Sequence, residues 1–139
     1  MNASLLLITH PGVGEALQRN ARDILGSCPM PLATLAPQAG ESVSATRSRA
    51  EALLAELDRG AGVLILTDAY GATPSNLAVA LATAHDHPVV AGVNLPMVLR
   101  VMNYAHLPLE TLAEKALSSA RDGILMARAP AAAAGGGGE

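Results

Sequence analysis

Polar side chains stand directly after three apolar runs, at the places where a protein's chemistry is often carried out. His10 follows the run SLLLIT, Asp68 follows GVLILT, and Asn94 follows PVVAGV. Thr73 comes five residues after Asp68, just before a proline. Such runs are typical of buried strands, and reactive groups gather beyond the carboxyl ends of the strands in open parallel sheets. We therefore expect these four residues to form one site.

The residue types favour nucleophilic chemistry at a histidine. The imidazole of His10 is partly neutral near pH 7 and has two distinct nitrogens. A carboxylate such as Asp68 can accept a hydrogen bond from one nitrogen and leave the other free to attack. The backbone amides of a helix that begins near Thr73, with the Thr73 hydroxyl, could hold phosphate oxygens. A plainer interpretation is that His10 is a polar loop residue and that Thr73 only caps a helix.

Other candidate sites are less well supported. A metal site at His85 and His87 would need ligands that the sequence does not clearly supply, so we expect a solvated loop and no metal. Cys28 has no basic neighbour to activate it, and we expect it to be inert. A nucleotide-binding P-loop and a G-x-S-x-G nucleophile elbow are both absent from the sequence, and no cofactor is expected.

The elements that must position these residues alternate along the chain. Apolar residues at helical spacing follow each strand, and Pro74 and Pro96 each lie near an expected helix start, with Thr73 as the N-cap of the first. Alternating strands and helices predict an α/β fold, a doubly wound and mostly parallel β-sheet with helices on both faces. A short strand over Gly123–Ala127 is predicted to end the sheet. We expect one domain over residues 1–127 and a flexible Ala/Gly-rich tail over residues 128–139.

Composition limits the partners. The net charge is −3, and the chain has no basic cluster and only two aromatic residues, both tyrosines. Nucleic acid and an anionic membrane surface are therefore not expected as main partners. The apolar run after Ser4 is too short for direct membrane insertion. A single cysteine and no signal-peptide pattern favour a cytoplasmic location.

Three segments resemble the mannose-type (mannose/fructose/sorbose) enzyme IIA component of the bacterial phosphoenolpyruvate-dependent sugar phosphotransferase system. They are LLLITHPGVGEAL, GVLILTDAYGATPSNLA and VVAGVNLPMVLRVM, in the order that the family has. The resemblance spans about residues 4–127. Pro11 and Ala72 depart from it, because the family commonly has glycine at both places.

The resemblance implies a function and a set of partners. His10 would accept a phosphoryl group on Nε2 from the phosphohistidine carrier HPr and pass it to a IIB component. Asp68 would orient the ring as the second catalytic residue, while Thr73 and Asn94 would bind phosphate. The family also implies a homodimer in which two copies exchange the final strand.

Two alternative functions stay open. The chain could be a regulatory phospho-switch without sugar transport, or the phosphocarrier of a dihydroxyacetone kinase, which shares the fold and the early histidine. The sequence gives no sugar specificity, since IIA proteins contact the phosphoryl group and protein partners.

Overall fold

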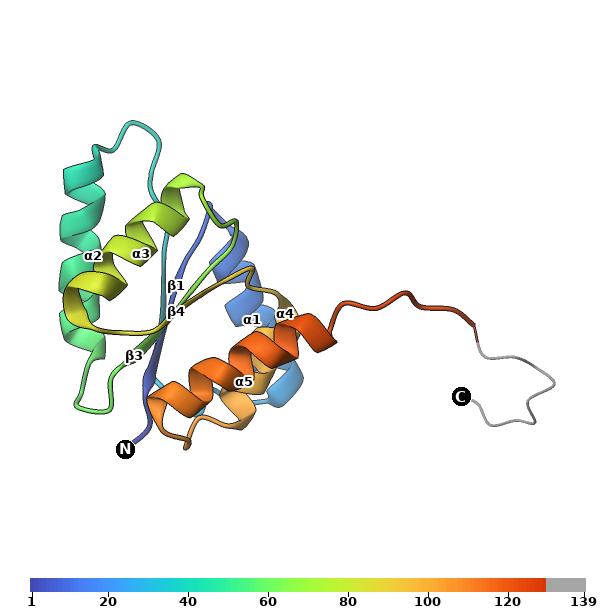
Figure 1. Ribbon diagram of the computed structural model, residues 1–139. Helices are drawn as coiled ribbons and strands as arrows, with labels where there is room; N and C mark the ends of the chain where they lie inside the picture. The colour runs from blue at the N-terminus through green and yellow to red at the C-terminus, as the bar shows by residue number, and fades with distance from the viewer. Residues whose placement is uncertain (130–139) are drawn as a thin grey trace.

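The structure, a computed structural model, describes residues 1–129 and consists of parallel strands that alternate with helices (Figure 1). The strands are β1 (Ser4–Ile8), β2 (Leu32–Leu35), β3 (Val63–Thr67) and β4 (Val89–Ala91). The helices are α1 (Val13–Leu25), α2 (Val43–Leu57), α3 (Thr73–His85), α4 (Leu95–Asn103) and α5 (Leu109–Asp122).

The strand order in the sheet is β2-β1-β3-β4, and every pairing is parallel. In the register of the central pair, Ile8 at the end of β1 lies opposite Thr67 at the end of β3. The residues that follow these two strands therefore emerge next to each other at the carboxyl edge of the sheet. The predicted α/β fold with a parallel sheet is confirmed.

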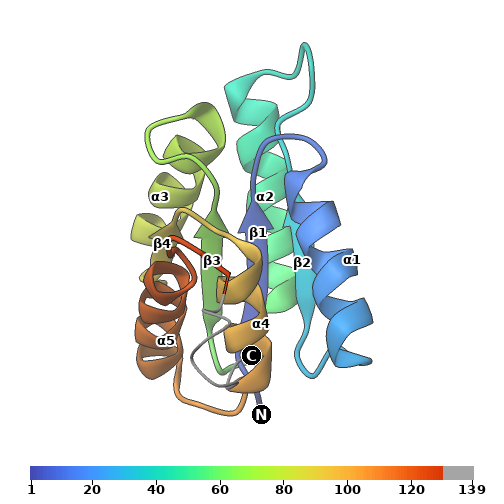
Figure 2. The same cartoon turned by 90° about the vertical axis from the view of Figure 1, so that its right-hand side faces the viewer.

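Helices cover both faces of the sheet, as Figure 1 shows with the sheet nearly edge-on. The central strands β1 and β3 are buried at every position, so their side chains fill two separate cores in alternation. Leu64 and Leu66 pack with residues of α1, α4 and α5. Val63 and Ile65 pack with residues of α2 and α3. Figure 2 shows α1, α4 and α5 in front of the sheet, on the face turned toward the viewer.

The start of α3 differs from the prediction. Ala72 is the N-cap residue, with an extended backbone, and Thr73 is already the first residue of the helix. The cap position therefore has no side-chain hydrogen bond. The Ser75 hydroxyl instead accepts a hydrogen bond from the Gly71 N–H, which closes the preceding turn. The Thr73 hydroxyl is consequently not used as a cap.

The predicted strand over Gly123–Ala127 is wrong for the single chain. After α5 the backbone has no regular structure, and it runs away from the body of the molecule (Figure 1). A strand needs a neighbour for its backbone hydrogen bonds, and this segment has none within the described chain. Its apolar side chains are exposed to solvent at 77 % for Ile124, 72 % for Leu125 and 85 % for Met126. The expected tail over residues 128–139 lies mostly outside the described residues.

A salt bridge fixes the loop between β2 and α2. The Arg49 guanidinium donates hydrogen bonds to both carboxylate oxygens of Glu41, at 2.7 and 2.8 Å, and to the Ala36 carbonyl at 2.8 Å. Hydrogen bonds from Arg49 and from the Gln38 N–H lower the pKa of Glu41 from 4.5 to about 2. A bidentate pair of this kind defines geometry as well as charge, so it holds the loop over the end of β2.

We predict that Arg49→Met raises the pKa of Glu41 toward 4.5, since Arg49 contributes the largest part of the lowering while the Gln38 N–H and the Thr46 hydroxyl remain. In the folded wild type the pKa is depressed, so the contribution of this pair to stability is present above pH 4.5 and is lost as the pH falls toward 2. A carboxyl-carbon NMR titration of both proteins measures the change. Arg19→Met, which removes an exposed arginine of α1, is the matched control and should leave Glu41 unchanged. An unaltered Glu41 titration in Arg49→Met would contradict the assignment.

Candidate active site

The site centres on His10 and Asp68, which meet at the carboxyl edge of the two central strands. The ring Nδ1 of His10 lies 2.9 Å from Oδ2 of Asp68. The same oxygen accepts a hydrogen bond from the backbone N–H of His10, also at 2.9 Å. One carboxylate oxygen therefore holds both the backbone and the ring of the histidine.

The position of this pair follows from the strand order. The chain leaves β1 toward β2 on one side and later returns to β3 on the other, so the direction of winding reverses between β1 and β3. At such a switch point the connecting loops diverge and leave a crevice. Asp68 directly follows β3 and His10 lies two residues beyond β1, which is why residues 58 positions apart come together.

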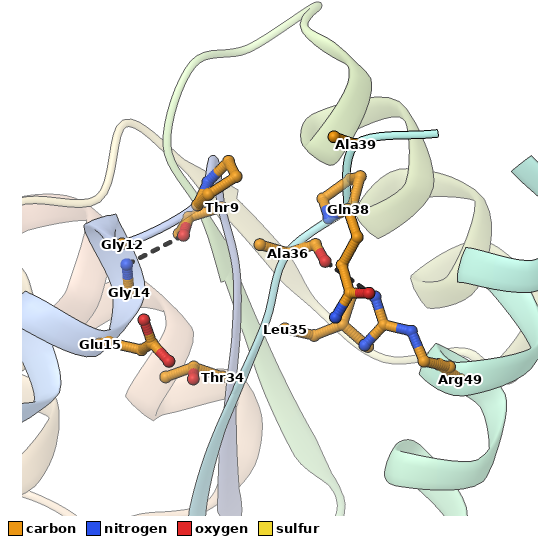
Figure 3. A pocket seen from close by; sticks show the side chains of 12 residues that line it. Thr9, Gly12, Gly14, Glu15, Thr34, Leu35, Ala36, Gln38, Ala39 and Arg49 are labelled. Carbon is orange, nitrogen blue, oxygen red and sulfur yellow. Dashed lines mark hydrogen bonds between the residues drawn. The ribbon is translucent and has the colours of Figure 1, made fainter. Parts of the chain in front are cut away.

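The loop after β1 is held by a residue that the sequence analysis did not single out. The buried Thr9 hydroxyl donates a hydrogen bond to the His10 carbonyl at 2.8 Å and accepts one from the Gly14 N–H at 2.9 Å; the second bond is drawn in Figure 3. Gly12, with a φ of 86°, allows the sharp turn into α1. The only sequence signal for Thr9 is a hydroxyl at the end of an otherwise apolar strand.

The contact with Asp68 selects one tautomer of His10. A carboxylate only accepts hydrogen bonds, so the neutral ring carries its proton on Nδ1 and leaves the lone pair of Nε2 free. The His10 side chain is 49 % exposed, whereas that of Asp68 is 16 % exposed. The arrangement presents a nucleophilic nitrogen to solvent above a shielded carboxylate.

Asp68 is held in its ionised form. Its other oxygen, Oδ1, accepts a hydrogen bond from the Ala69 N–H at 2.9 Å. Partial burial would raise the pKa of Asp68, but the hydrogen bonds from the His10 backbone, the His10 ring and the Ala69 N–H together lower it below its usual 3.8. The group is therefore a carboxylate throughout the neutral range.

Thr73 lies on the same edge of the sheet, as the sequence predicted, but it does not contact the central pair. It is exposed at the first turn of α3, and within residues 1–129 no hydrogen bond joins it to His10 or Asp68. The first backbone N–H groups of any helix have no carbonyl partner within it. The prediction that Thr73 binds phosphate remains a prediction.

Asn94 is used inside the protein. Its Oδ1 accepts a hydrogen bond from the Met97 N–H at 3.0 Å and caps α4, while its Nδ2 donates to the Ala120 carbonyl of α5 at 3.2 Å. In this arrangement the side chain links the start of α4 to the end of α5. The second N–H of Nδ2 has no partner within residues 1–129, so the prediction that Asn94 binds phosphate remains a prediction.

The two remaining histidines of interest lie at the opposite end of the sheet. His85 Nε2 is 2.6 Å from a carboxylate oxygen of Glu51, and His87 Nε2 is 3.7 Å from one of Asp58. Within the described part of the chain, no three His, Cys, Asp or Glu side chains are grouped so that they could hold a metal ion.

The half-buried Cys28 thiol donates a hydrogen bond to the Met30 carbonyl. Over residues 1–129, no helix has the length and apolarity needed to cross a membrane.

Comparison with known proteins assigns the family. Residues 4–117 match the EIIA-man family, described as the PTS system fructose IIA component. The chain belongs to this family. The resemblance in the sequence is thereby confirmed, and the family is one of phosphoryl carriers of the sugar phosphotransferase system.

Curated relatives and solved structures agree with this assignment. The chain is 31 % identical over 103 residues to the mannose-specific EIIAB components of the phosphotransferase system from Escherichia coli K12 and Shigella flexneri. That match covers 73 % of this chain but 32 % of each relative, so the chain spans about a third of their length.

Two solved structures share the fold. The mannose/sorbose-specific IIA subunit from Enterococcus faecalis superposes with a TM-score of 0.81 at 23 % identity, covering 94 % of this chain and 98 % of that one. The component EIIA from Streptococcus agalactiae gives a TM-score of 0.76 at 24 % identity, covering 91 % of this chain and 97 % of that one. At these identities the likeness concerns the fold.

We predict that His10→Ala raises the pKa of Asp68. The substitution removes the hydrogen bond from the ring and keeps those from the backbone N–H groups of His10 and Ala69. Because the folded-state pKa is depressed, the stabilisation is complete above pH 3.8 and is lost as the pH falls through the folded value. Carboxyl-carbon NMR of the wild type and the variant gives both values. His106→Ala, which removes an exposed histidine far from the pair, should not move Asp68; an unmoved Asp68 in His10→Ala would contradict the geometry.

Proposed function

We propose that this protein is a cytoplasmic phosphoryl carrier that accepts a phosphoryl group from phospho-HPr on Nε2 of His10 and transfers it to a IIB component. The observation that carries the proposal is the bond between His10 Nδ1 and Asp68 Oδ2, which leaves Nε2 as the free and exposed nitrogen. Membership of the IIA family supplies the class of reaction.

In the proposed step the lone pair of Nε2 attacks the phosphorus of the donor phosphohistidine. The new N–P bond forms as the N–P bond of the donor breaks, and the donor imidazole leaves with the electron pair of that bond. Positive charge develops on the His10 ring, and the adjacent Asp68 carboxylate stabilises it. Transfer to the IIB component is the same exchange with His10 as the leaving group, so one site serves both directions.

The start of α3 is the best candidate for holding the phosphoryl oxygens. The N–H groups of Thr73 and Ser75 at its first turn have no partner within residues 1–129 and carry partial positive charge, and the Thr73 hydroxyl is exposed beside them. Both follow Asp68 in the chain at the same edge of the sheet. We therefore propose that Thr73 and the α3 amides bind the phosphoryl group, while Asn94 acts by fixing the start of α4.

We predict a single phosphorylation at His10. Incubation with enzyme I, HPr and phosphoenolpyruvate should add the mass of one phosphoryl group to the intact chain, and acid should remove it because a protonated phosphoramidate breaks readily. His10→Ala should gain no mass, whereas His106→Ala, with another exposed histidine removed, should be labelled like the wild type. Labelling of His10→Ala, or an unlabelled wild type, would refute the proposed function.

We further predict that Asp68→Ala slows phosphoryl transfer by about ten- to a hundredfold. A charge-assisted hydrogen bond contributes roughly 1.5–3 kcal/mol, and about 1.4 kcal/mol corresponds to a factor of ten in rate. Quench-flow measurement of transfer from phospho-HPr tests this. Asp23→Ala, which removes an exposed carboxylate of α1, is the control and should transfer at the wild-type rate. A wild-type rate in Asp68→Ala would reduce Asp68 to a loop residue without a part in catalysis.

We also propose that the protein forms a homodimer through residues 123–127. The segment leaves α5 at the carboxyl edge of the sheet, where Asn94 contacts Ala120. Its three exposed apolar side chains would gain a cover in a second copy. An edge strand with free backbone groups readily pairs with another chain.

Light scattering should therefore give twice the 14.1 kDa mass of the chain at micromolar concentration. A version that ends at Asp122 should be monomeric, since it lacks the exchanged segment. A full-length variant with Ile124, Leu125 and Met126 changed to serine separates the effect of these side chains from that of length and should also be monomeric. A monomeric wild type would contradict the dimer.

A further inference from the structure

A hollow of about 480 Å³ lies at the carboxyl edge of the sheet, between the ends of β1 and β2 (Figure 3). Its walls are the start of α1, the end of β2 and the loop that leads to α2. Its volume is in the range of small-molecule sites. His10 and Asp68 do not line it, but Thr9 and Pro11, which flank His10 in the chain, do. The hollow therefore lies beside the proposed phosphoryl-transfer site.

Two glycines, Gly12 and Gly14, line the hollow on the α1 side. A Cβ at Gly14 would lie 3.2 Å from the Thr9 hydroxyl and 3.4 Å from the Thr34 Cβ, so glycine here lets the start of α1 pack closely on the sheet beside the hollow. The opposite side is held by the bond from Arg49 to the Ala36 carbonyl. Both walls are thus fixed before any ligand arrives.

Three polar side chains without a protein partner face this hollow. Within residues 1–129, the Glu15 carboxylate, the Thr34 hydroxyl and the Gln38 side-chain amide make no hydrogen bond or salt bridge to another group. Figure 3 shows Glu15 and Thr34 on the α1 side and Gln38 on the α2 side. Convergent polar groups on a preformed hollow are the usual mark of a ligand site.

The charges at the hollow define the class of ligand. Arg49 also lines it, but its charge is compensated by Glu41 in a bidentate pair. The uncompensated charge is that of Glu15, which disfavours phosphate and other anions. A carboxylate that only accepts hydrogen bonds, next to a hydroxyl and an amide that donate and accept, suits a ligand rich in hydroxyl groups. No aromatic side chain is among the residues that line the space, and its apolar part comes from Pro11, Leu35 and Pro37 with two alanines.

We infer that this hollow binds a small, uncharged, polyhydroxylated molecule, with the Glu15 carboxylate accepting hydrogen bonds from adjacent hydroxyls. Thr34 and Gln38 complete the set of polar contacts from the other two walls. The inference concerns the unphosphorylated chain and does not depend on phosphoryl transfer.

The test is a ¹⁵N-NMR titration of the full chain with myo-inositol and with xylitol. At least one of them should cause saturable shifts confined to the amides around the hollow, at Gly12, Gly14, Glu15, Thr34 and Gln38. Glu15→Ala should weaken binding by about tenfold or more, the range for a hydrogen bond to a charged group. Thr34→Val, which keeps the shape of the side chain and loses its hydroxyl, should weaken binding by a smaller factor.

Two controls distinguish hydrogen bonding of a polyol in the hollow from a general effect of charge. Glu110→Ala removes an exposed acidic residue from the first turn of α5, the position that Glu15 has in α1, and should bind like the wild type. Tetramethylammonium carries positive charge without hydrogen-bond donors and should cause no saturable shift at the hollow. The inference is overturned if neither polyol gives localised saturable shifts, if Glu15→Ala binds as tightly as the wild type, or if tetramethylammonium occupies the hollow equally well.

Discussion

The reversal of winding between β1 and β3 is the constraint on which the site depends. In a sheet of order β2-β1-β3-β4 the chain leaves the two central strands in opposite directions, and a crevice forms there between the two loops at the carboxyl edge. The parallel register then brings the ends of both strands to the same level. A histidine after one and a carboxylate after the other meet without any special length of loop. The chemistry is thereby located by the topology, and the side chains need only be of the right type.

The rest of the fold keeps these two strands in place. Every side chain of β1 and β3 is buried, so each central strand is held between two aliphatic cores and cannot shift along its neighbour without exposing apolar surface. Leucine, valine and alanine fill both cores, with methionine added on the α1 side and isoleucine on the α2 side. Within residues 1–129 no aromatic ring is fully buried, and Tyr104 packs only partly buried against the first core. Because burial stabilises in proportion to apolar area, many small contacts replace the few large ones that aromatic residues would supply. The packing of β1 and β3 between the two cores therefore holds the residues of the site in place.

The strands, the helices and the central pair could be predicted from the sequence because they depend on local signals. Unbroken apolar runs marked β1 and β3, and polar residues at their ends marked His10 and Asp68. The exact cap of α3 could not be predicted, since Thr73 and Ala72 are both compatible with a proline one or two residues later. The strand over Gly123–Ala127 was expected from composition alone, but a strand also needs a partner, which a sequence pattern does not supply. The Arg49 pair and the hollow between β1 and β2 depend on side chains that meet only after the sheet has formed.

Oδ2 of Asp68 accepts two hydrogen bonds from His10, and only one of them depends on the state of the ring. The bond from the ring of His10 depends on the chemical state of that ring, whereas the bond from the backbone N–H does not. The loop is therefore anchored in the same way whether the imidazole is free, protonated or substituted. In the transfer that we propose, this backbone bond has no need to break when His10 gains or loses a phosphoryl group. The loop can then keep one anchor for both halves of the reaction.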